Sequence, residues 1–292
     1  MNSLARRACL YGSAAVAIAS IGLVWVSRPK DADLMTLLSS VDTQLRLAHG
    51  IPARDAQGKL LSARTDMITA AEKYLVEIER MRPGIACAAE FRGFAHMLKE
   101  QYVQAADWYE RAQRCRDCTE EQRDVLAFNQ ARMLAKAGRG QQALGVFAQH
   151  GKRLDSRFGT QRFLEEAAIL RTLGRADEAR QKLAAVVAEP STSPVARMLA
   201  GIEYGALGDH ATAVQLLASV SEDVPIAAYH LAQLKLQQGD VDSSLDLLGR
   251  AAKAQPAEVR RKLRDEATAW SAVAADVRFQ EITKSGPAAP AR

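Results

Sequence analysis

The sequence predicts an all-α protein in which an N-terminal transmembrane helix precedes an α-solenoid of repeated helical hairpins. Composition is the first observation: alanine, leucine, glutamine and arginine are abundant among the 292 residues, whereas aromatic residues make up only 5%. Such a composition favours helix over strand. The second observation is an uncharged apolar run near the N-terminus. The third is a pattern of small and large residues that recurs five times along the chain.

The apolar run extends from Ala8 to Val26 and has basic residues on both sides. A helix of this length spans roughly 28 Å, which matches the hydrocarbon thickness of a bilayer. We therefore interpret residues 1–30 as a signal anchor with a transmembrane segment. The alternative is a cleaved signal peptide, for which residues 17–19 would supply the small-residue cleavage pattern. Cleavage there would leave a further apolar stretch at the new N-terminus, which favours the uncleaved anchor.

The formal charge of +5 is located mainly at the N-terminus. Residues 1–30 carry four of the 39 basic residues and no acidic residue, which leaves 35 basic against 34 acidic residues in the remainder. No basic stripe with interleaved aromatic residues is present, so nucleic acid is not an expected partner. The short basic lead is typical of a bacterial inner-membrane anchor, and we expect the body in the periplasm. The cytoplasmic side and the mitochondrial inner membrane are the alternatives.

A helical pair is expected between the anchor and the repeats, over residues 31–84. The first helix should cover residues 32–48, where apolar residues recur at helical spacing. These residues are Leu34, Leu37, Leu38, Val41 and Leu45. The second helix follows a break at residues 49–52 and ends at Pro83-Gly84. We interpret the pair as a degenerate leading repeat.

Five hairpins are predicted over residues 85–256 from stretches that align with one another. Each stretch has a small residue followed four positions later by a large one: Ala105/Tyr109, Ala143/Phe147, Ala179/Leu183, Ala213/Leu217 and Ser244/Leu248. A glycine precedes the small residue by five positions in four stretches, at Gly138, Gly174, Gly208 and Gly239. A second small residue precedes it by twelve positions, at Gly93, Ala131, Ala167, Gly201 and Ala232.

This pattern indicates two antiparallel helices in contact, which we call helix A and helix B of each hairpin. Glycine can adopt the left-handed conformation that ends helix A and permits a tight turn into helix B. The two small residues allow the helices to approach closely. The large residue lies on the same face of helix B as the small residue one turn before it.

The repeats resemble those of the tetratricopeptide repeat (TPR) family over roughly residues 86–256. In the first unit, the family's small positions are matched by Gly93, Ala105 and Ala112, and its aromatic positions by Tyr102 and Tyr109. Departures from the family pattern are the variable spacing of the units and Ser244 at a position that is usually alanine. Related helical-hairpin repeats are therefore the alternative for individual units.

The resemblance implies that the A helices line a concave groove that binds an extended peptide or a helix of a partner protein. The groove positions of the family correspond here to Phe94, Phe128, Asn129, Arg132, Tyr229, His230 and Gln233. For the three aromatic residues of this set, the alternative is packing between repeats. Some TPR domains grip the C-terminal carboxylate of a chaperone, but only Asn129 matches the residues that they use. That partner is not expected.

A closing segment is expected over residues 257–284, followed by a flexible tail over residues 285–292. The apolar residues of this segment are Val259, Leu263, Trp270 and Val273. We interpret them as one face of a capping helix, which a solenoid needs to cover the end of its core.

Catalytic motifs are not found, so we expect no enzyme activity, no metal and no cofactor. The five histidines are scattered, and signatures of zinc proteases, hydrolases and nucleotide-binding loops are missing from the sequence. Cys115 and Cys118 form a CxxC pair without further zinc ligands nearby. The TPR resemblance places the start of helix A beside the end of helix B. It thereby implies a disulfide from Cys87 to Cys115 or Cys118 in an exported protein, with unpaired thiols as the alternative.

These features together predict a membrane-anchored TPR scaffold or adaptor that binds partner proteins in an envelope-associated complex. The membrane contact is made by the N-terminal helix and the partner contact by the concave groove. The alternative is a self-assembling structural membrane protein, in which residues 32–81 or the repeats form a homo-oligomer.

Overall fold

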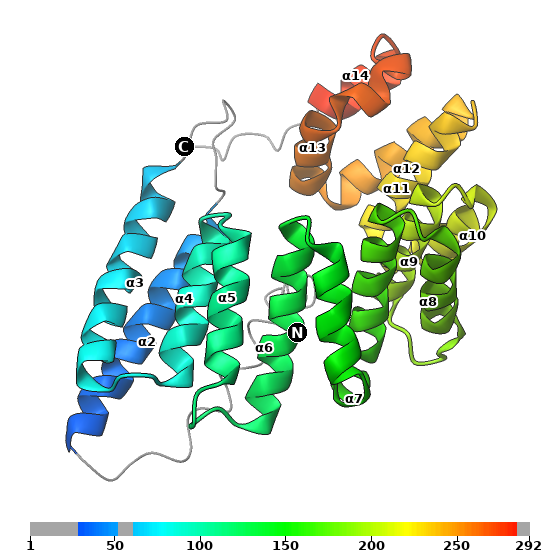
Figure 1. Ribbon diagram of the computed structural model, residues 1–292. Helices are drawn as coiled ribbons and strands as arrows, with labels where there is room; N and C mark the ends of the chain where they lie inside the picture. Colours follow the sequence, from blue (N-terminus) through cyan, green and yellow to red (C-terminus); the bar gives the residue numbers. More distant parts are fainter. Residues whose placement is uncertain (1–28, 52–60, 285–292) are drawn as a thin grey trace, which may run out of the picture. The chain divides into compact units, whose positions relative to one another are not determined.

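A computed structural model describes residues 29–51 and 61–284 of the chain (Figure 1). Every regular element in these ranges is a helix. The predicted transmembrane segment and the predicted tail lie outside the described residues. Within the described ranges, no helix combines the length and the apolar character that crossing a membrane requires. The chain divides into two compact units, Met1–Arg162 and Phe163–Arg292, which we describe separately.

The described part of the first unit is a series of antiparallel helical hairpins. In chain order they are α2 (Pro29–Gly50) with α3 (Ser62–Met81), α4 (Ala86–Leu98) with α5 (Tyr102–Gln113), and α6 (Glu120–Lys136) with the first part of α7 (Gly140–Thr172). The expected leading pair corresponds to α2 and α3. Their contact is formed by buried residues that include Leu38, Val41 and Leu45 of α2 and Ile68 and Leu75 of α3.

The second unit continues with hairpins and ends in a C-terminal segment of short helices. The hairpins are the last part of α7 with α8 (Ala176–Ala188), α9 (Pro194–Ala206) with α10 (His210–Val220), and α11 (Pro225–Gln237) with α12 (Val241–Ala254). The C-terminal segment comprises α13 (Pro256–Asp265), the 3-10 helix η3 (Ala267–Val273) and α14 (Val277–Lys284). We call these three helices the C-terminal cap.

The predicted glycine turns are confirmed in the repeats. Gly138, Gly174, Gly208 and Gly239 have φ angles of 75°, 74°, 80° and 83°. After each glycine, the next N–H donates to the carbonyl five residues earlier, as in a Schellman motif. In the α4–α5 turn, Glu100 adopts the same conformation with φ of 60°. A residue with a Cβ pays about 1 kcal/mol or more for this conformation.

The small residues of the pattern lie in the contact between helix A and helix B. A Cβ at Gly93 would lie 2.8 Å from the ring of Tyr109, and one at Gly201 would lie 3.0 Å from Cγ of Leu217. Ser244 is fully buried, and its hydroxyl donates to the carbonyl of Ala232 on the paired helix at 2.8 Å. The serine is therefore accommodated at an alanine position because α11 itself satisfies its hydroxyl.

Helix B of the second hairpin and helix A of the third lie within α7 as two helices, which meet at a kink where Phe158 has non-helical angles (φ −129°, ψ 15°). The C-terminal segment differs from the sequence expectation, since a single capping helix was expected. The chain forms three short helices instead, and the non-helical Glu266 (φ −119°, ψ 30°) separates the first two.

Replacing Gly93 with alanine should lower the free energy of unfolding by about 1–3 kcal/mol, because the added methyl group would overlap the Tyr109 ring. The midpoint of urea unfolding, followed by circular dichroism, measures this change. Gly145→Ala in α7 is the matched control, since no atom lies within 4 Å of a Cβ there. The control change should raise stability by up to about 1 kcal/mol. Equal midpoints for the two variants would contradict a tight contact at Gly93.

Candidate protein-binding surface

Phe128 of α6 belongs to the core of the first unit. It is 2% exposed, and its ring stacks on that of Phe158 with a centroid distance of 4.8 Å. The centroid of the Phe147 ring lies 5.8 Å from that of the Phe128 ring. The packing alternative therefore holds for Phe128. Its assignment as a partner-binding residue is corrected, because a side chain enclosed in this way offers no surface to a ligand.

Phe94, Asn129 and Arg132 are half-buried on the helix-A face of α4 and α6. Phe94 packs against the core between α2 and α4, and its ring lies 5.8 Å from that of His49. The Arg132 guanidinium lies 5.9 Å from the centroid of the Phe128 ring. These three residues retain accessible surface on two neighbouring A helices. Their role in binding a partner stays a prediction.

Glu90 lies one turn before Phe94 on the same face of α4. Burial, and next to it the charge of Asp42 on α2, raise the pKa of Glu90 to about 7. Asp42 also receives two hydrogen bonds from Nε of Arg46, both at 2.8 Å. The Glu90 carboxyl is therefore near its titration midpoint at neutral pH. A cation brought by a ligand would stabilise its charged form.

In the second unit, the predicted groove residues of α11 are covered by the C-terminal cap. Tyr229 has no exposed surface, and its hydroxyl donates to the Glu266 carboxylate at 3.0 Å. Gln233 donates to the same oxygen at 2.6 Å, and the indole N–H of Trp270 donates to the Tyr229 hydroxyl at 3.1 Å. The assignment of Tyr229 to partner binding is corrected in favour of packing. Gln233 is already engaged by the chain's own Glu266.

His230 is half-buried beside the same network. Its ring meets that of Tyr229 edge-on at 5.4 Å. Burial is the main cause that lowers the pKa of His230 to about 4, and the charge of Lys262 is the next cause. Lys262 itself lies 3.4 Å from the Glu266 carboxylate. The sequence analysis missed Lys262 and Glu266, although their spacing of four residues on a helix is a recognisable ion-pair signal.

Among the described residues of the first unit, Cys87, Cys115 and Cys118 are free thiols. Burial is the main cause that raises the pKa of Cys87 to about 12 and that of Cys118 to about 11. It also raises the pKa of Cys115. Thiolate, the reactive form, is therefore scarce at all three sites near neutral pH. The disulfide from Cys87 to Cys115 or Cys118 stays a prediction.

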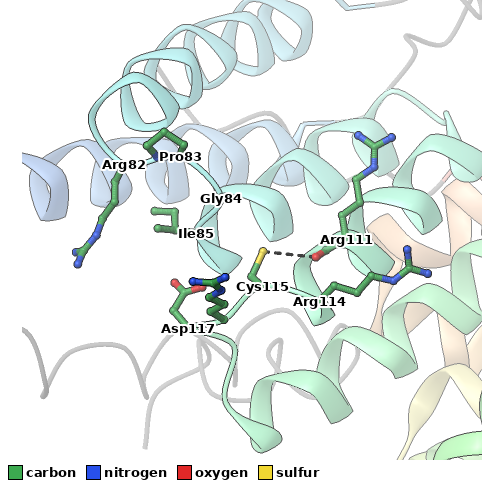
Figure 2. A pocket seen from close by; sticks show the side chains of 9 residues that line it. Arg82, Pro83, Gly84, Ile85, Arg111, Arg114, Cys115 and Asp117 are labelled. Atoms are coloured by element: carbon green, nitrogen blue, oxygen red, sulfur yellow. Dashed lines mark hydrogen bonds between the residues drawn. The ribbon is translucent and has the colours of Figure 1, made fainter.

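An open depression of about 580 Å³ lies where the end of α3, the start of α4 and the end of α5 meet (Figure 2). Asp117 borders it and accepts a hydrogen bond from the backbone N–H of Ala86 at 3.0 Å, which caps α4. The residues that line it are Arg82, Pro83, Gly84, Ile85, Arg111, Arg114, Cys115, Arg116 and Asp117. Over the part of the chain described here, no three His, Cys, Asp or Glu side chains are grouped so that they could hold a metal ion.

Comparison with solved structures finds TPR proteins. A tetratricopeptide repeat protein from Parabacteroides merdae ATCC 43184 matches 84% of this chain and 98% of its own, with 14% identity and a TM-score of 0.50. The Cut9–Hcn1 hetero-tetramer of the APC/C matches 96% of this chain, with 13% identity and a TM-score of 0.50, and this chain covers 58% of that one. Protein-family models and curated proteins give no match. The similarity therefore establishes a TPR-like fold.

Tyr229→Phe should loosen the C-terminal cap, because it leaves the buried indole N–H of Trp270 without its acceptor. An unsatisfied buried donor costs about 1–3 kcal/mol. We expect amide hydrogen exchange in α13 and η3 to quicken by about tenfold. Tyr74→Phe, at an exposed tyrosine of α3, is the control and should change nothing in the cap. Unchanged exchange in Tyr229→Phe would refute the role of this hydroxyl.

Acid should weaken the same cap through His230. Its pKa in the folded protein, about 4, is below the ordinary value of 6.5, so the unfolded chain binds the proton more readily. The stabilisation is complete above pH 6.5 and is lost as pH falls from 6.5 toward 4. At pH 5 the loss should reach up to about 2 kcal/mol. Hydrogen exchange of α13 at pH 7 and pH 5, corrected for intrinsic rates, measures it. His230→Gln should abolish the difference, and a difference that persists would assign it to another group.

Proposed function

We propose that this protein is a membrane-anchored scaffold that binds partner proteins through the helix-A face of its first unit. The observation that carries the proposal is the contrast between two faces of one repeat type. On α4 and α6, the face keeps half-buried Glu90, Phe94, Asn129 and Arg132. On α11, the equivalent face is engaged by the protein's own cap. The contrast favours the first unit as the place where a partner binds.

The side chains of this face indicate the chemistry of the partner. Phe94 offers part of an aromatic ring, and Asn129 offers an amide that can both donate to and accept from a peptide backbone. Glu90 is an acid whose charge is poorly stabilised in the free protein. A peptide or helix with an apolar residue next to a lysine or arginine fits this set, because the cation would offset the desolvation of Glu90.

The anchor is the second part of the proposal. Residues 8–26 are uncharged and long enough to cross a bilayer, and basic residues flank them. We propose that they hold the protein in a bacterial inner membrane with the repeats in the periplasm. Resistance to carbonate extraction, together with protease access to the repeats in spheroplasts, tests both the insertion and the orientation.

In-cell crosslinking of the full-length protein should recover a defined set of partner proteins. The double variant Asn129→Ala/Arg132→Glu should reduce that recovery by about tenfold or more, because truncation of a central interface residue costs over about 1 kcal/mol. Arg139→Glu, at an exposed arginine in the α6–α7 turn, is the control and should recover the set unchanged. Equal recovery from the two variants would place partner binding elsewhere.

Self-assembly is the second candidate, and exposed apolar side chains on the leading pair favour it. These are Met35 and Leu47 of α2 and Tyr74, Val76 and Met81 of α3. The stripe that contains Leu38, Val41 and Leu45 is buried inside the hairpin, so a contact between copies would use the outer residues. Recovery of the protein alone, at a multiple of its own mass in detergent, would support this candidate over the scaffold.

A further inference from the structure

The depression at the end of the α4–α5 hairpin is strongly basic. Four of its lining residues are arginines, and Asp117 is its one acidic residue (Figure 2). The Arg111 guanidinium lies 4.8 Å from the centroid of the Trp108 ring, so an aromatic surface supports it. Arg114 forms an ion pair with Glu110. The carboxylate of Asp117 is directed to the N-terminus of α4. Arg111 and Arg116 are both exposed, and they are the two arginines on which the inference rests.

This depression lies at the same end of the first unit as the start of α2. Because α2 and α3 form an antiparallel hairpin, the first residues of α2 lie beside the end of α3, from which Arg82 leads into α4 (Figure 1). The 22 residues of α2 place its other end about 33 Å away. In the sequence, only Ser27 and Arg28 separate the proposed membrane segment from Pro29, the first residue of α2. A membrane that holds this segment would therefore be close to the basic end.

We propose that the depression docks on an anionic membrane surface, where the guanidinium groups of Arg111 and Arg116 contact lipid phosphates. Arginine suits this role because its planar group of donors matches phosphate geometry. Each basic residue near an anionic surface strengthens attachment by about fivefold, and the effect acts within a Debye length of about 10 Å at 0.1 M salt. This inference rests on the proposed anchor. The anchor and the depression together would fix the direction of the first unit relative to the membrane.

Cys115 is a natural reporter for this contact, since its thiol lines the depression and is partly accessible. The full-length protein is placed in lipid nanodiscs of phosphatidylcholine, with or without phosphatidylglycerol. The rate at which N-ethylmaleimide modifies Cys115 is then measured by peptide mass spectrometry. We expect phosphatidylglycerol to slow this modification by about fivefold. The protection should disappear at 0.5 M salt, where screening is nearly complete at short range.

A charge-reversal pair tests the residues themselves. Arg111→Glu/Arg116→Glu changes two exposed arginines of the depression and should bring the ratio of rates in the two discs to one. Lys136→Glu/Arg139→Glu makes the same charge change at the opposite edge of the hairpins and should keep the wild-type ratio. A wild-type ratio of one, or the same ratio in both variants, would overturn the proposal.

Two further outcomes separate the ligand and the anchor. Soluble glycerol phosphate or a poly-glutamate peptide that protects Cys115 in phosphatidylcholine discs, while phosphatidylglycerol does not, would overturn membrane docking in favour of a free phosphate or an acidic peptide. If the protein stays in discs of both compositions and the ratio of modification rates is one, the anchor is supported and only the docking is refuted. Protein that enters only discs with phosphatidylglycerol, with the ratio dependent on Arg111 and Arg116, would refute only the anchor.

Discussion

The close contact between helix A and helix B of each hairpin is the constraint on which the structure depends. Gly93 and Gly201 leave no room for a Cβ beside Tyr109 and Leu217, and the small residues Ala105 and Ala213 of the paired B helices are fully buried. Such an approach is possible only if the turn between the helices is tight, which the left-handed residue provides. Turn and contact are thus two parts of one requirement. That is why a glycine, a small residue and a large residue recur together in the sequence.

The same requirement explains how much of the fold could be predicted. Small and large residues in contact leave a pattern in the sequence, so the hairpins and most turns were found without a structure. Glu100 carries no such signal, because its left-handed conformation is imposed by the helices on either side rather than favoured by the residue. The kink at Phe158 in α7 has no such signal either. Breaks between repeats are marked only where proline or glycine is needed, as at Pro194 and Pro225.

The candidate site was predicted less well, since groove positions were taken from a family in which the A helices are exposed. Phe128 is enclosed by Phe147 and Phe158, which come from helix α7. Tyr229 is enclosed by Trp270, which lies 41 residues away in the sequence. Neither contact follows from helical periodicity, because each depends on which neighbouring segment covers the helix face. Sequence patterns therefore identified the face of the A helices but not the segments of the chain that cover it.

Antiparallel hairpins separate the residues that stabilise the fold from those that are free to change. The contact between helices runs along their length and tolerates little variation, as the 2.8 Å approach at Gly93 shows. At the edge where B helices end and A helices begin, the side chains of Arg111 and Arg116 are exposed. Charge can accumulate there without cost to the core. Folding alone therefore does not require basic residues at the edge beside the start of α2. Their presence there is better explained by a contact with an anionic surface.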